Sequence, residues 1–230
     1  MYRAASIMVF MAMAVMISEI FLTMAPDGAA DLGARTGMEK WFEVFERNPF
    51  MAMRNLGLIN IIATTIMVPV FFSLWGAHKE EQPVLAGLML LVFSAGYAIF
   101  MAGNSAFPML ALSLKHSSST PEMQMTLSAA GEALIARGAS HTPGTFPAFT
   151  LSEASSVLLG ILMYRGKAFS KAAGILGICA FAMMFAFEVM ASFIPALADP
   201  AMIFAMIGGI GAIVWYVFLA TGLWKLSKKE

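Results

Sequence analysis

Six apolar stretches, each long enough to cross a bilayer, hold most of the hydrophobic residues of this chain. A helix rises about 1.5 Å per residue, so roughly 20 apolar residues cross the hydrocarbon core. Backbone polar groups in lipid must be satisfied within the segment, which favours helices. The sequence therefore predicts an all-α integral membrane protein, a six-transmembrane-helix bundle. The expected spans cover residues 4–25, 56–77, 83–103, 146–164, 172–194 and 200–224.

Composition favours a single domain. Hydrophobic residues make up 60% of the chain and charged residues 12%, whereas soluble proteins average about 25% charged. The 230 residues suffice for six spans with modest loops, so we expect one transmembrane domain over residues 1–230. The formal net charge of zero gives no global basic field for nucleic acid. One cysteine, Cys179, excludes an intrachain disulfide, and its apolar context predicts a small buried side chain.

The two long loops are predicted to contain helices on the outer side. Segment 37–47 places apolar and charged residues on opposite faces at helical spacing. This pattern predicts an amphipathic helix at the outer membrane interface, with Trp41 as its anchor. In the second loop, Thr120 suits an N-cap and Pro121 the first helical position, so a second outer helix is expected over residues 120–137.

The third apolar run is longer than one crossing needs, because it stays uncharged from Pro83 to Leu114. Gly103, Asn104 and Pro108 are residues that interrupt helices. We therefore expect the span to end at residue 103 and a separate emergent or interfacial helix to follow over residues 106–114.

Charge distribution predicts the orientation. With both termini in the cytoplasm, the inner side has short, basic loops, as the positive-inside bias requires. The alternative is that the first span is a cleaved signal peptide, with small residues near Ala25. That alternative ranks second, because the apolar run is long and contains Glu19. We expect a multi-pass protein of the cytoplasmic membrane, whose inner cations are Arg3, Lys79, Arg165, Lys167, Lys171, Lys225, Lys228 and Lys229.

Three carboxylates lie inside the predicted spans, at a cost of several kcal/mol each in hydrocarbon. Counting residues at about 1.5 Å each puts Glu19, Glu153 and Glu188 roughly 10 Å below the outer boundary. Shared depth on three spans favours one outward-open polar pocket. The alternative is that each protonated carboxyl bonds a neighbouring helix and only holds the bundle together. The predicted ligand-binding residues are Glu19, Glu153, Glu188, Asn60, Asn104 and Arg54.

Motifs for several chemistries are lacking in the sequence. The three histidines (His78, His116 and His141) fall in predicted loops, so no pair is placed to ligate a haem between spans. There is no HExxH and no carboxylate–histidine metal box, so we predict neither a metal nor a cofactor, and catalytic residues stay unknown. The 21 methionines are scattered over all spans, which favours apolar filler over copper binding.

Some short runs resemble a known family. They are residues 104–114 (NSAFPMLALSL), 129–134 (AAGEAL), 164–167 (YRGK) and 173–177 (AGILG). Together they resemble the bacterial and archaeal membrane family catalogued as domain of unknown function four-three-eight-six. The resemblance implies a six-helix protein of about this length and adds no catalytic residues. The methionine content and residues 41–47 depart from the family pattern.

The leading functional hypothesis is a receptor or carrier for a small amphipathic or cationic ligand, bound in the polar pocket. The second is a structural or accessory subunit of a membrane complex, whose carboxylates bridge helices. The third is an intramembrane enzyme acting on lipid with a glutamate as general base, although no orienting partner is evident. An enzyme is the least favoured of the three. The expected partners are the bilayer, a small ligand, and either a membrane-complex subunit or a second copy of the chain.

Overall fold

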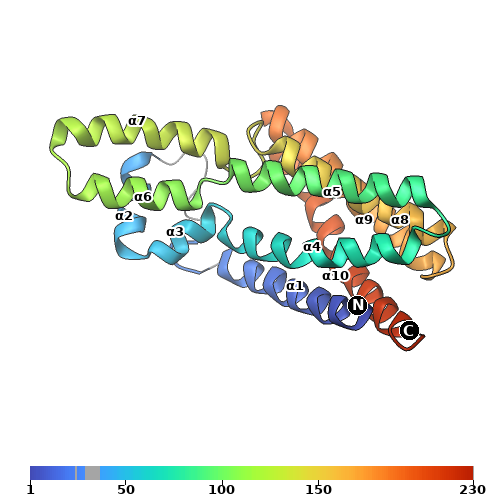
Figure 1. Ribbon diagram of the computed structural model, residues 1–230. Coiled ribbons are helices and arrows are strands. Elements are labelled where there is room, and N and C mark those ends of the chain that lie inside the picture. The colour runs from blue at the N-terminus through green and yellow to red at the C-terminus, as the bar shows by residue number, and fades with distance from the viewer. Residues whose placement is uncertain (24, 29–36, 230) are drawn as a thin grey trace.

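The computed structural model describes residues 1–23, 25–28 and 37–229, and these form helices but no strand. Figure 1 shows the elements in order along the chain. They are α1 (Tyr2–Thr23), α2 (Met38–Arg47), α3 (Pro49–Asn55), α4 (Leu58–His78), α5 (Pro83–Gly103), α6 (Ala106–Ser117), α7 (Pro121–Gly138), α8 (Phe146–Arg165), α9 (Lys171–Phe193), the 3-10 turn η1 (Pro195–Leu197) and α10 (Ala198–Leu226).

Six of these helices are long and apolar enough to cross a membrane. They are α1, α4, α5, α8, α9 and α10, and the apolar run of α5 continues past a break into α6. Their ends lie within two residues of the boundaries expected from the sequence, and the break before residue 106 is confirmed. The protein is therefore an all-α membrane protein built on six spans. The short helix α3 was not predicted.

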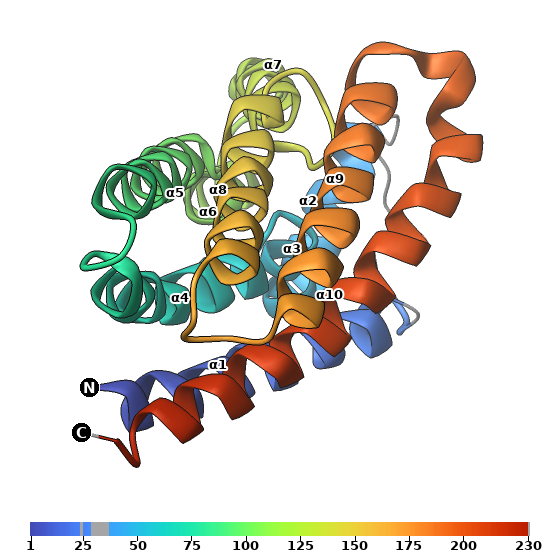
Figure 2. The same ribbon diagram turned by 90° about the vertical axis from the view of Figure 1, so that its right-hand side faces the viewer.

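The six long helices close into a ring. Each packs against the next in the order α1, α4, α5, α8, α9, α10, and α10 returns to α1. A buried hydrogen bond of 2.7 Å from Ser6 Oγ to the Ala220 carbonyl joins the first and last helices. Both chain ends lie at the same end of the bundle (Figures 1 and 2). We name this end the terminal side.

The opposite end carries a cap of α2, α3, α6 and α7, and we name it the cap side (Figure 1). Both predicted outer helices are present, as α2 and α7. The predicted role of Trp41 is wrong, however. Its side chain is only 3% exposed and packs inside the cap, because the apolar face of α2 meets α3 and α6. The cap thus has its own small hydrophobic core, separate from that of the bundle.

A glycine and an asparagine join the cap to the bundle. Gly57, between α3 and α4, has a φ of +89°, which favours glycine, and a Cβ there would lie 2.9 Å from the amide nitrogen of Asn104. Asn104 donates to the Leu56 carbonyl at 2.9 Å and accepts from the Ala106 amide at 2.9 Å. This side chain therefore ends α5, begins α6 and anchors the start of α4.

The terminal half of the ring is packed mainly with hydrocarbon, and its buried polar side chains include Ser6, Ser73 and His78. Leu159, Leu162, Trp215, Leu219 and Leu223 are among its fully buried residues. Close helix approach helps to fill it, as between α8 and α9, where a Cβ on Gly174 would lie 2.7 Å from the Gly160 carbonyl. Because this packing leaves little space between the helices of the terminal half, a polar cavity is expected in the cap-side half.

One further prediction from the sequence is wrong. Cys179 was expected to be buried, but it lies exposed on α9. Its neighbour Ala180 is buried, and positions one residue apart on a helix face different directions. In a membrane span, an exposed apolar face of this kind is expected to meet lipid.

Candidate functional site

The centre of the ring holds a cavity of about 180 Å³. All six spans contribute to its lining, so its shape exists only in the closed ring. Polar and aromatic side chains dominate the wall, and the packed terminal half lies below. The lining residues are Ala12, Met16, Asn60, Ala63, Thr64, Met67, Phe71, Phe93, Phe100, Ala148, Phe149, Ser152, Glu153, Ser156, Phe181 and Tyr216.

Glu153, on α8, is the only acidic residue among the lining residues that the structure describes. Its side chain is 7% exposed, and its Oε2 atom is buried without a hydrogen-bond partner in the described part of the chain. The hydroxyls of Thr64 and Ser156 are already bonded to carbonyls of their own helices, at 2.7 and 3.1 Å. The unpaired carboxyl oxygen is therefore the polar group most in need of a partner here.

Aromatic rings form much of the remaining wall. Phe71 and Phe93 stack face to face with centroids 3.8 Å apart. Phe100 and Phe149 meet edge to face, with centroids 5.9 Å apart. The negative face of an aromatic ring attracts cations, so a carboxylate among rings suits a positively charged group.

Glu188, on α9, is fully buried but does not line the cavity. Its Oε1 lies 2.5 Å from Nδ1 of His141, whose side chain is 42% exposed. The imidazole also packs edge-on against Phe187 at 4.7 Å and stacks near Phe149 at 5.5 Å. Phe149 also lines the central cavity, so the pair of His141 and Glu188 adjoins the cavity wall.

His141 is a site residue that the sequence analysis missed. The loop assignment for His141 is correct, but the loop folds back over α9. The expectation that the other two histidines lie in loops is wrong. His78 lies in the last turn of α4 and is fully buried, and His116 lies in α6, where it stacks on Phe42 at 3.9 Å. Sequence spacing carries no signal for contacts made by loop closure.

Glu19 lies apart from the cavity, in an ion pair with Arg54 of α3. The guanidinium reaches Oε1 of Glu19 at 2.8 Å, Oε2 at 3.1 Å and the Glu19 carbonyl at 2.7 Å. It also bonds Thr23 and, at 2.9 Å, the side chain of Asn55. Arg54 is almost entirely buried, so these contacts bind the cap to the end of α1.

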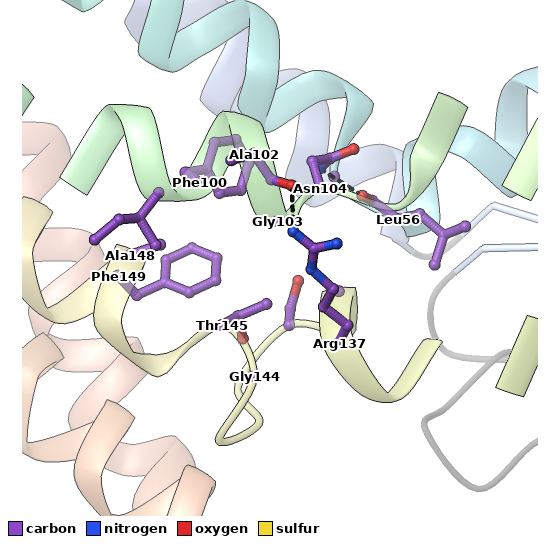
Figure 3. A pocket seen from close by; sticks show the side chains of 14 residues that line it. Leu56, Phe100, Ala102, Gly103, Asn104, Arg137, Gly144, Thr145, Ala148 and Phe149 are labelled. Atoms are coloured by element: carbon purple, nitrogen blue, oxygen red, sulfur yellow. Dashed lines mark hydrogen bonds between the residues drawn. The ribbon is translucent and has the colours of Figure 1, made fainter. Parts of the chain in front are cut away.

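A second cavity, of about 220 Å³, lies where the cap meets the bundle (Figure 3). Asn104 lines it, together with Gly103, Arg137, Gly144 and Thr145. Figure 3 shows the guanidinium of Arg137 bonded to the carbonyl of Ala102, and this distance is 2.7 Å. We name this the cap cavity and the first one the central cavity.

The six predicted ligand-binding residues are therefore divided among four places. Glu153 and Asn60 share the central cavity, and Asn104 lines the cap cavity. Glu188 pairs with His141, and Glu19 pairs with Arg54. The sequence analysis expected one pocket for all six residues. In the structure, Glu19 and Glu188 are paired with Arg54 and His141 instead, because a buried charge without a partner is costly.

The geometry thus defines a helical membrane protein with an aromatic, acidic cavity at its centre. Comparison of the chain with protein-family models, with curated proteins and with solved structures finds no match. The family resemblance of the short motifs stays a prediction.

Proposed function

We propose that the protein binds a small organic cation in the central cavity, with Glu153 as the counter-charge. The observation that carries the proposal is the buried Oε2 of Glu153, which has no hydrogen-bond partner in the described residues. A carboxylate at this depth is expensive unless a cation or proton accompanies it. The surrounding rings favour an alkylammonium group over a hydrated metal ion.

Size supports the same ligand class. The central cavity of about 180 Å³ is smaller than the roughly 300 Å³ at which pockets for drug-sized ligands begin. A cavity of this size accommodates a ligand of a few non-hydrogen atoms. Because hydrocarbon fills the terminal half, this conformation supports binding from the cap side rather than passage through the bundle.

Binding of tetramethylammonium and butylammonium to the purified protein tests the proposal, measured by isothermal titration calorimetry in an uncharged detergent. Glu153→Gln preserves the shape and removes the charge, so we expect affinity to fall about tenfold or more, the equivalent of one charge-assisted hydrogen bond. Glu132→Gln, on the exposed surface of α7, is the matched control and should bind like the wild type. Equal binding by Glu153→Gln, or no binding of either cation by the wild type, would overturn the proposal.

A second candidate function is a structural or accessory subunit. It is favoured by the two other carboxylates, since Glu19 joins α1 to α3 and Glu188 joins α9 to the loop after α7. Such pairs are typical of polar side chains that hold neighbouring segments together. If this is the whole function, a larger complex co-purifies with the tagged protein, and Glu153→Gln leaves that complex intact.

For the orientation, we propose that the terminal side faces the cytoplasm. The basic residues of the short connections between α4 and α5 and between α8 and α9 lie at this end, as do those near both chain ends. The positive-inside bias counts short loops most heavily, and both of these are short. We further propose a prokaryotic cytoplasmic membrane, because the short motifs resemble a bacterial and archaeal family.

A further inference from the structure

The cap cavity has chemistry opposite to that of the central cavity. Arg137 is the only ionisable residue among its described lining residues. One of its five N–H donors is used by the Ala102 carbonyl, and no carboxylate pairs with it in the described part of the chain. Figure 3 shows the guanidinium projecting from α7 toward Ala102 and Gly103 across the cavity. The remaining donors suit a carboxylate or a phosphate.

The two cavities adjoin along a shared set of apolar residues. Phe100, Ala148 and Phe149 line both of them. The edge-to-face pair of Phe100 and Phe149 therefore borders both cavities, with Arg137 lining one of them and Glu153 the other. The three shared residues are apolar, so they suit the hydrocarbon part of a ligand that extends from one cavity into the other.

Helix α8 shows that the two cavities lie at different depths. Thr145, just before its first residue, lines the cap cavity, and Glu153 lines the central cavity. Eight residues separate them, which is about 12 Å at about 1.5 Å per residue. Because the two cavities lie at different depths, the complementary ligand has charges several bonds apart rather than adjacent.

We infer that the ligand is a zwitterion whose two charged ends are joined by a short hydrocarbon chain. The ammonium end pairs with Glu153, the hydrocarbon lies against Phe100 and Phe149, and the anionic end binds Arg137. This inference rests on the proposed function for the ammonium end and adds the second subsite. Recognition of both ends and of their separation would distinguish such a molecule from simple amines and from compact zwitterions.

A series of ω-amino acids tests the inference, with 4-aminobutanoate, 6-aminohexanoate and 8-aminooctanoate as the ligands and octylammonium as the matched cation without a carboxylate. In the wild type, 8-aminooctanoate should bind about tenfold tighter than octylammonium, since the carboxylate adds a charge-assisted contact. It should also bind more tightly than 4-aminobutanoate, whose ends are too close to reach both charges. Dihexanoyl-phosphatidylethanolamine represents the lipid headgroup as an alternative source of a zwitterion.

Variants separate the two ends. Arg137→Gln should remove the advantage of 8-aminooctanoate and leave octylammonium binding unchanged, whereas Glu153→Gln should weaken both. Arg137→Lys keeps the charge and should keep most of the advantage. Lys115→Gln, an exposed cation of the cap, is the control and should have no effect. The melting temperature of each variant shows that it is folded.

Three results would overturn the inference. The first is equal affinity for 8-aminooctanoate and octylammonium, with Glu153 still required. In that case the second subsite fails and the proposed function stands. The second is tighter binding of the phosphatidylethanolamine, which would assign the site to a compact headgroup. The third is an absence of any Glu153-dependent binding, which removes the proposed function together with the inference.

Discussion

The ion pair between Arg54 and Glu19 should contribute a large part of the attachment of the cap to the bundle. The Arg54 side chain is 1% exposed and that of Glu19 is 27% exposed. In Arg54→Met, the contacts to the Glu19 carboxylate, the Glu19 carbonyl, Thr23 and Asn55 are all lost. The Glu19 carboxylate then loses its counter-charge at the end of a membrane-spanning helix.

The expected size of this loss follows from burial. Breaking a fully buried pair costs about 3–5 kcal/mol. Glu19 retains some access to water, which recovers part of its solvation, so we expect a loss of about 3 kcal/mol. For a chain of this length, 1 kcal/mol shifts the melting temperature by roughly 2–4 °C, so the melting temperature should fall by roughly 6–12 °C.

Intrinsic fluorescence of the detergent-solubilised protein measures this change, because Trp41 in the cap and Trp215 in the bundle are both buried. Arg47→Met is the matched control, since Arg47 pairs with Asp27 while 66% exposed, and no measurable shift is expected. Adding Glu19→Leu to Arg54→Met should recover part of the loss, as an apolar pair replaces an unpaired charge. A melting temperature within about 2 °C of the wild type for Arg54→Met would refute the reasoning.

Three further predictions concern packing and orientation. Gly174→Ala should lower the free energy of unfolding by about 1–3 kcal/mol, because the added Cβ meets the backbone of α8. Gly209→Ala has open space around the added Cβ and should be neutral or slightly stabilising. Thermal unfolding compares the two variants. In intact membranes, Cys179 should react with an apolar maleimide and resist a membrane-impermeant sulfonated thiol reagent, and rapid labelling by the charged reagent would place that face of α9 against water. Reporter fusions to either chain end should both give the cytoplasmic signal, and opposite signals from the two ends would contradict an even number of spans.

The central cavity was partly predictable from the sequence. Glu153 was placed at the depth of the predicted pocket by residue counts, Asn60 was predicted to share that pocket, and the two line one cavity. Depth along a helix follows from the rise per residue, which holds whatever the neighbours are. The direction in which a side chain points around its helix depends on packing, and for this reason Glu188 and Glu19, at similar depth, lie outside the cavity with His141 and Arg54.

The sequence by itself determined the number of spans, their limits and the two cap helices, because hydrophobic length and local helix signals are properties of contiguous residues. The closed ring, the burial of Trp41 in the cap and the division of polar groups between two cavities were decided only by the tertiary structure. These features depend on contacts between residues far apart in the chain. These contacts form only when the chain folds, and the periodic pattern of apolar residues along the sequence does not predict them.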